Sequence, residues 1–144
     1  MEILHVGKVS VPARIENVFD TLAVVDGSLA VDQVRSVEVE DALVDTGATM
    51  LSLPKRFIHQ LGLRRLRSRT ARTPAGVLSF NIYEPVKLIV QQRDCMIQVA
   101  EVPDDCPVLI GQIPLEMLDF VVDPVNQPLI GNPDHGGEQM IDMF

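Results

Sequence analysis

Tryptophan is absent from this 144-residue chain, tyrosine occurs once, and aromatic residues together make up only 4% of it. The hydrophobic fraction is nevertheless 47%, so the core must be built mainly from valine, leucine and isoleucine. Valine and isoleucine favour strands, because their branched side chains are stiff and pack well on a pleated surface. The composition therefore predicts a β-rich fold with an aliphatic core, and the length suits one domain.

Basic residues are in the minority. The chain has 12 lysines and arginines against 20 aspartates and glutamates, and its formal net charge is −8. Such a charge argues against general binding of nucleic acids. No apolar run approaches membrane-spanning length, and residues 1–5 lack the basic region and apolar stretch of a signal peptide. We therefore expect neither nucleic acid nor a membrane as a partner, and a cytoplasmic location.

Cysteine and histidine are also scarce. Cys95 and Cys106 are the only cysteines. Without a secretion signal we expect reduced thiols, although a short strand–turn–strand unit could bring the two close together. The histidines at 5, 59 and 135 are far apart and lack the spacing of metal ligands. We expect no metal and no organic cofactor.

One segment indicates chemistry. Asp45-Thr46-Gly47-Ala48-Thr49 directly follows the apolar pair Leu43-Val44, which predicts a carboxylate at the end of a buried strand. An ionised carboxylate is costly there unless neighbouring groups donate hydrogen bonds to it. Thr46 offers a hydroxyl, and Gly47 lets backbone N–H groups approach without an intervening Cβ. We interpret Asp45 as catalytic; the alternative is an ordinary turn, where Asp-x-Gly is common.

A second segment strengthens this interpretation. Val108-Leu109-Ile110-Gly111-Gln112 is followed by Leu115-Glu116, and together with residues 43–49 it resembles the paired signatures of the retropepsin-like (retroviral-type) aspartic protease family, in its bacterial single-domain branch. The resemblance extends from about Val37 to Ile130. Both signatures also begin a similar series of apolar strand, glycine-containing loop and proline-initiated helix, a pseudo-repeat on which such protomers are built.

The resemblance implies an all-β fold. The expected protomer is a closed β-barrel of the acid-protease type with one or two short helices. It would form a single domain over residues 1–144. Within it, N-terminal strands and a hairpin would occupy about 1–36, the core 37–131 and a tail 132–144.

The implied chemistry needs two carboxylates that share one proton, because like charges about 3 Å apart cannot both ionise readily. The chain contains a single Asp-Thr-Gly, so the second carboxylate must come from another copy, which implies a two-fold homodimer. One Asp45 would activate a water molecule while the other polarises the carbonyl of a peptide substrate, with no covalent intermediate. The expected activity is that of an aspartic-type endopeptidase, a hydrolase, with its active-site loop supported by Thr46, Gly47, Ala48 and Gly111.

Substrate contacts are expected on both sides of the loop. Pro74-Ala75-Gly76 lies between two extended segments and predicts a hairpin tip, which the resemblance equates with the flap over the substrate. Thr49, Met50 and Gln112 complete the expected substrate-binding set. Retroviral enzymes usually carry an acidic residue and an arginine where Thr49 and Gln112 stand. A salt bridge is therefore replaced by a polar pair, or by nothing.

A basic stretch adjoins the predicted flap. Seven of the 12 basic residues lie between Lys55 and Arg72, with no acidic residue among them. Arg65, Arg67 and Arg69 would share one face of a strand. The stretch predicts either capture of an acidic substrate or partner, or a solvated strand face that balances acidic neighbours elsewhere.

The remaining elements are predicted from local patterns. Val9-Ser10-Val11 indicates a strand that ends at Pro12. Leu22–Val25 and Leu29–Val34 flank Asp26-Gly27, a strong hairpin signal. We further expect a short helix from Pro54 capped by Gly62, paired strands over 86–90 and 95–102 joined near Arg93-Asp94, a helix over 114–120, and a strand at 129–130 after a turn at 126–128.

Two functional alternatives stay open beside general proteolysis. One is a peptide-binding or regulatory dimer with the same fold and little or no turnover. The other is an enzyme that processes a single dedicated partner. The tail over 132–138 resembles an ending of bacterial retropepsin-like proteins, without an assigned role. The apolar residues 140–144 would be buried by a terminal strand at the dimer interface, or would fray.

Overall fold

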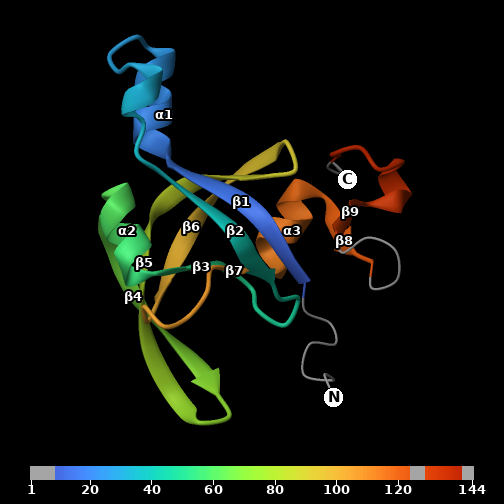
Figure 1. The fold of residues 1–144 in the computed structure, drawn as a ribbon. Helices are drawn as coiled ribbons and strands as arrows, with labels where there is room; N and C mark the ends of the chain where they lie inside the picture. The colour runs from blue at the N-terminus through green and yellow to red at the C-terminus, as the bar shows by residue number, and fades with distance from the viewer. Residues whose placement is uncertain (1–8, 124–128, 141–144) are drawn as a thin grey trace.

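The computed structural model of the chain describes residues 9–123 and 129–140 (Figure 1). Strands dominate this part of the chain. They are β1 (Val9–Asn17), β2 (Ser36–Val44), β3 (Leu51–Pro54), β4 (Arg65–Thr73), β5 (Gly76–Val90), β6 (Arg93–Val102), β7 (Leu109–Ile110), β8 (Phe120–Val122) and β9 (Leu129–Gly131). The helices are α1 (Val18–Val25), α2 (Lys55–Leu61) and α3 (Gln112–Leu118), with short 3₁₀ turns η2 (Val31–Gln33) and η3 (Pro133–His135). No helix of the described residues is long and apolar enough to cross a membrane.

The first seven strands form one sheet in the order β1-β2-β7-β3-β6-β5-β4, and β8 pairs with β9 separately. β1 also pairs with β5, from Arg14 opposite Ile89 to Asn17 opposite Val86. Because this contact involves only the last residues of β1, the curled sheet is not a clearly closed barrel. The prediction of a mainly β fold is confirmed, and the closed barrel is not clearly formed.

The core is aliphatic, as the composition predicted. Ile15 of β1, Leu51 and Leu53 of β3, and Leu88 of β5 have no exposed surface. Burial of one such side chain contributes roughly 1.5–3 kcal/mol, so these residues can stabilise the domain without tryptophan. Phe120 is the only buried aromatic side chain among the described residues.

The predicted N-terminal hairpin is wrong. Residues 18–25 form α1 instead of a strand, and residues 31–33 form η2. Asn17 begins α1, since its side-chain oxygen accepts a hydrogen bond from the Asp20 N–H at 3.1 Å. The Asn17 amide also donates to the Leu61 carbonyl at 2.8 Å, which ties the helix start to α2. This long-range bond has no local signature in the sequence.

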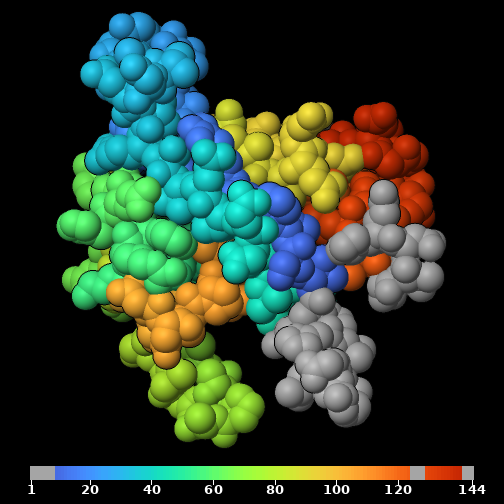
Figure 2. Space-filling model, viewed as in Figure 1, coloured from blue at the N-terminus to red at the C-terminus, as the bar shows by residue number. Residues whose placement is uncertain are grey.

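Asp26-Gly27 ends α1 rather than turning a hairpin. Gly27 adopts a φ of +85°, the left-handed conformation that commonly follows a helix. An Asp-Gly dipeptide can therefore end a helix as well as form the turn of a hairpin. α1 projects from one end of the molecule, opposite the hairpin of β4 and β5, which projects from the other end (Figures 1 and 2).

Pro12 was expected to end the first strand, but β1 continues through it. The register against β2 shifts between Val11 and Ala13, so the proline lies at a β-bulge. Its missing N–H is tolerated there because a bulge interrupts the ladder of hydrogen bonds.

Several other predictions are confirmed with small shifts. α2 follows Pro54 and ends at Gly62, which has a φ of +65°. The β4–β5 hairpin turns at residues 74–76, as expected. α3 starts two residues earlier than predicted, at Gln112, and ends before the left-handed Asp119.

The connection between β5 and β6 lies at Gln91-Gln92 rather than at Arg93-Asp94. Both glutamines have positive φ values, 49° and 69°, as a tight two-residue hairpin turn requires. Glutamine gives no sequence signal for such a turn. The predicted strand at 129–130 is present as β9, while the turn at 126–128 and residues 141–144 lie outside the described residues.

Both cysteines are unpaired thiols, as predicted. Cys95 is buried in β6 and Cys106 is half-buried in the loop before β7. Burial raises the pKa of the Cys95 thiol to about 11, with the nearby Asp94 charge adding to the effect. Cys95 therefore acts as a small apolar core residue.

Candidate active site

Asp45 stands where β2 leaves the core. Its backbone N–H donates to the Ile110 carbonyl at 3.0 Å, and its own carbonyl accepts from Ala48 N–H at 3.0 Å. The carboxylate is half-buried, and its Oδ1 accepts a hydrogen bond from Gly47 N–H at 2.9 Å. The predicted pattern is thus present: a carboxylate at a strand end, oriented by the backbone of the following glycine.

One short strand holds both ends of the loop. β7 runs parallel to β2, with Leu43 opposite Leu109, and antiparallel to β3, with Leu51 opposite Ile110. It therefore lies between the strand that precedes Asp45 and the strand that follows the loop. The two segments that resemble the family signatures, far apart in sequence, are adjacent in the structure.

Gly111 lets β7 and α3 approach the loop closely. A Cβ at this position would lie 2.6 Å from the carbonyl oxygen of Met50 and 2.6 Å from the carbonyl carbon of Thr49. These are backbone atoms of a loop bound on both sides, so they cannot move away easily. The Gly111 φ is −85°, which any residue can adopt, and the need for glycine here is therefore one of space.

The start of α3 also supports the loop. The N–H groups of Gln112 and Ile113 donate to the carbonyls of Ala48 at 2.8 Å and Thr49 at 3.0 Å. Donors at the start of a helix have no partner within the helix, so the loop supplies the acceptors. The side-chain amide of Gln112 instead donates a hydrogen bond to Oε1 of Glu116 at 3.1 Å. Thr49 and Gln112 thus take part in the contact between the loop and α3 through their backbone groups, not through their side chains.

The predicted substrate residues fall in two places. Thr49, Met50 and Gln112 lie next to the loop, and the exposed side chains of Thr46 and Thr49 face solvent. Pro74, Ala75 and Gly76 form the tip of the projecting β4–β5 hairpin (Figure 1). Among the described residues, the hydrogen bonds of this tip lie within the hairpin itself, where the Thr73 hydroxyl donates to the Gly76 carbonyl at 2.8 Å. The structure therefore does not bring the tip into contact with Asp45.

Comparisons with family models and with curated proteins found no match. No group of three or more His, Cys, Asp or Glu side chains within residues 9–123 and 129–140 could hold a metal ion.

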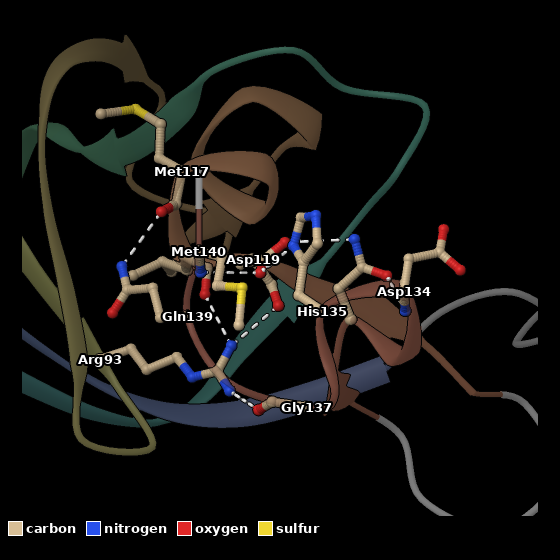
Figure 3. Close-up of polar contacts among 10 residues, drawn as sticks. Arg93, Met117, Asp119, Asp134, His135, Gly137, Gln139 and Met140 are labelled. Atoms are coloured by element: carbon tan, nitrogen blue, oxygen red, sulfur yellow. Dashed lines mark hydrogen bonds and ion pairs between the residues drawn. The ribbon is translucent and has the colours of Figure 1, made fainter. Parts of the chain in front are cut away.

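Sequence reasoning missed a polar cluster behind α3 (Figure 3). Asp119, which ends α3, is 5% exposed. Its Oδ2 lies 2.6 Å from Nδ1 of His135 and accepts from the Met140 N–H at 3.0 Å. Its Oδ1 accepts from the Asn132 amide at 3.2 Å. The tail over 132–140 is thus fastened to the end of the helix whose start binds the Asp45 loop.

Arg93 completes the cluster from β6. One guanidinium nitrogen donates to the carbonyls of Leu118 and Asp119, at 3.0 and 2.8 Å, and another to that of Gly137. The guanidinium also lies over the Phe120 ring, 4.5 Å from its centroid. The cluster thereby ties the β5–β6 hairpin, α3 and the tail together. The Asp-His-Gly-Gly sequence of the tail was visible, but nothing in it pointed to partners at 93 and 119.

The pKa of Asp119 is set by opposing effects. Burial raises it, but the hydrogen bonds from His135, Met140 N–H and Asn132 together outweigh burial and leave the pKa below its ordinary value. The carboxylate is therefore favoured in its ionised form. Its role is to anchor the tail, since it lies on the side of α3 away from the helix start that contacts the loop.

Proposed function

We propose that the chain is an aspartic endopeptidase of the retropepsin-like type, active as a homodimer. The observation that carries the proposal is the strand β7 and Gly111, which together hold the loop of Asp45 from both sides. A turn that only connects two strands does not need such support. A carboxylate that must keep a fixed position at the end of a strand does. Catalytic side chains are effective only when the surrounding residues hold them in place. β7 and Gly111 would hold the Asp45 loop in this way.

The pseudo-repeat predicted from the sequence also supports the family. β3 is followed by α2 and β7 by α3, and each helix ends in a left-handed residue, Gly62 and Asp119. The mainly β fold is consistent with a retropepsin-like protomer. The barrel closure that such a protomer would have is part of the proposal.

In the proposed mechanism the two Asp45 carboxylates, one from each copy, share one proton across the two-fold axis. The ionised carboxylate removes a proton from a water molecule as that water attacks the peptide carbonyl. The protonated partner donates to the carbonyl oxygen, and the resulting diol collapses with transfer of a proton to the leaving amine. The Gly47 N–H keeps one carboxylate oxygen in place throughout.

The β4–β5 hairpin would act as the flap. Its tip at Pro74-Ala75-Gly76 is exposed and would close over an extended substrate that pairs with the protein through backbone hydrogen bonds. Alternate substrate side chains would then enter pockets beside Thr49, Met50 and Gln112.

The direct test compares wild type with Asp45→Asn on a proteome-derived peptide library between about pH 4 and pH 8. Asparagine keeps an Oδ1 acceptor for Gly47 N–H, so the loop should stay intact. Asp41→Asn, an exposed carboxylate on the same strand, is the matched control. Cuts by wild type and the control, but not by Asp45→Asn, would support the proposal. If wild type is dimeric but makes no Asp45-dependent cuts, the peptide-binding alternative, or a single dedicated substrate, is favoured.

A further inference from the structure

A hollow of about 720 Å³ lies beside the catalytic loop, between that loop, the β4–β5 hairpin, β6 and α3. Its lining is largely apolar and rich in methionine, and includes Met50, Phe80, Met96, Ile113 and Met117. Methionine side chains are flexible and adapt to ligands of different shape. Met96 and Ile113 are 53% and 47% exposed, a considerable apolar surface for residues outside the core.

The charged side chains that line the hollow are basic. Arg67 and Arg69 of the basic stretch line it, and no aspartate or glutamate does. Arg67 donates to the neutral Gln98 side chain at 2.7 Å, so its charge is not balanced there. Arg69 has no ion pair among the described residues. By contrast Arg64, in the same stretch, is paired with the buried Glu84 at 2.5 Å.

The hollow therefore has uncompensated positive charge on a chain whose net charge is −8. Guanidinium groups favour carboxylates, with which they can form paired, charge-assisted hydrogen bonds. A ligand that matches both features carries an acidic side chain next to a large apolar one.

The hollow is within reach of the catalytic carboxylate. Thr49 and Met50 line it and follow Asp45 by four and five residues. An extended chain spans at most about 3.6 Å per residue, so the Cα atoms of Asp45 and Thr49 are at most roughly 14 Å apart. An extended substrate advances about 3.3 Å per residue. A substrate side chain that lies beside Thr49 would thus belong to a residue within about four positions of the cleaved bond.

We propose that this hollow is a specificity site for acidic–apolar peptide segments, in which Arg67 and Arg69 bind an aspartate or glutamate and the methionine-rich part of the lining binds a neighbouring aliphatic side chain. The inference rests on the proposed protease function. It assigns Arg67 and Arg69 of the basic stretch to substrate selection rather than to a solvated strand face.

The test uses matched peptides built around an Asp45-dependent cut, with Glu or Gln at each of the four positions on either side. At one position or more, Glu should raise kcat/KM over Gln by about tenfold, as expected for one charge-assisted hydrogen bond. Arg69→Gln should remove most of this preference. Arg72→Gln is the matched control, because Arg72 is exposed on the same strand and does not line the hollow.

The outcomes separate the two proposals. Asp45-dependent cleavage with equal rates for Glu and Gln peptides at all positions would overturn the specificity site and leave the protease function standing. If no Asp45-dependent cut is found, the wild-type protein is titrated instead with fluorescently labelled peptides in which Glu or Gln stands next to a leucine. Binding that prefers Glu and is lost in Arg69→Gln would support the site without the protease function. If binding shows no preference for Glu that depends on Arg69, the proposed specificity site is overturned as well.

Discussion

The backbone N–H of Gly111 donates to the Met50 carbonyl at 2.9 Å, and a Cβ on Gly111 would lie only 2.6 Å from that same oxygen. A residue outside the loop at 45–50 thus fixes that loop by a contact that leaves no room for a side chain. Because α3 begins immediately after Gly111 and binds two further loop carbonyls, the loop, β7 and α3 form one continuous unit.

Gly111→Ala should therefore damage both stability and activity. The added methyl group must displace backbone atoms of residues 49 and 50, and overpacking of this kind costs about 1–3 kcal/mol of unfolding free energy. Urea unfolding measures this loss. Gly47→Ala is the comparison, since its Cβ would meet only the Asp45 Oδ1, at 3.2 Å. We expect it to reduce peptide cleavage with a smaller loss of stability. Equal stability of Gly111→Ala and wild type would contradict the close-packing argument.

Asp119→Asn should lower stability in a pH-dependent way. The folded-state pKa of Asp119 lies below its ordinary value, so the carboxylate stabilises the fold above an unfolded pKa of about 3.9. This contribution is lost as pH falls through the folded pKa. Asparagine tolerates the left-handed backbone at 119, where φ is 60°, so the substitution tests the charge rather than the conformation.

Denaturant unfolding at neutral pH and at about pH 3 measures the effect. The variant should be less stable than wild type at neutral pH, and the difference should narrow in acid. Asp134→Asn, at an exposed position in the same tail, should show neither effect. A difference between Asp119→Asn and wild type that grows as pH falls would contradict the assigned role.

The two cysteines should differ in reactivity. With a pKa of about 11, only about one Cys95 thiol in a thousand is ionised at about pH 8, and burial also blocks access. Alkylation followed by mass spectrometry should label Cys106 in the folded protein and Cys95 only after denaturation. Rapid labelling of Cys95 in the native protein would show that β6 is not packed as described.

The sequence was most informative where residues close together do the work. The loop at 45–49 and the glycine at 111 were identified because each follows a short apolar run. The structure confirms their adjacency, and the catalytic role stays a prediction. The turn of the β4–β5 hairpin was predicted for a similar reason, since Pro74-Ala75-Gly76 is itself a turn signal, and its role as a flap stays a prediction.

Other features could not be predicted because their causes are distant in sequence or ambiguous locally. Asp26-Gly27 is equally suited to a hairpin and to a helix end, and the Asn17 bond to Leu61 that favours the helix crosses 44 residues. The cluster of Arg93, Asp119 and His135 unites three separate elements, and no local pattern relates them. The apolar–basic hollow likewise forms only when the hairpin and α3 are placed together.

In the proposed dimer two copies of the chain each contribute Asp45 to one site, and mixing active with inactive subunits tests this arrangement. Wild type is equilibrated with increasing amounts of Asp45→Asn, and the rate of cleavage per wild-type chain is measured on a peptide that wild type cuts. With a ninefold excess of the variant, random pairing leaves about a tenth of wild-type chains with a wild-type partner. The rate per wild-type chain should therefore fall to about one tenth, while an equal excess of an unrelated protein should leave it unchanged. A rate that does not change with Asp45→Asn, under conditions where mixed dimers are demonstrated, would contradict a shared active site.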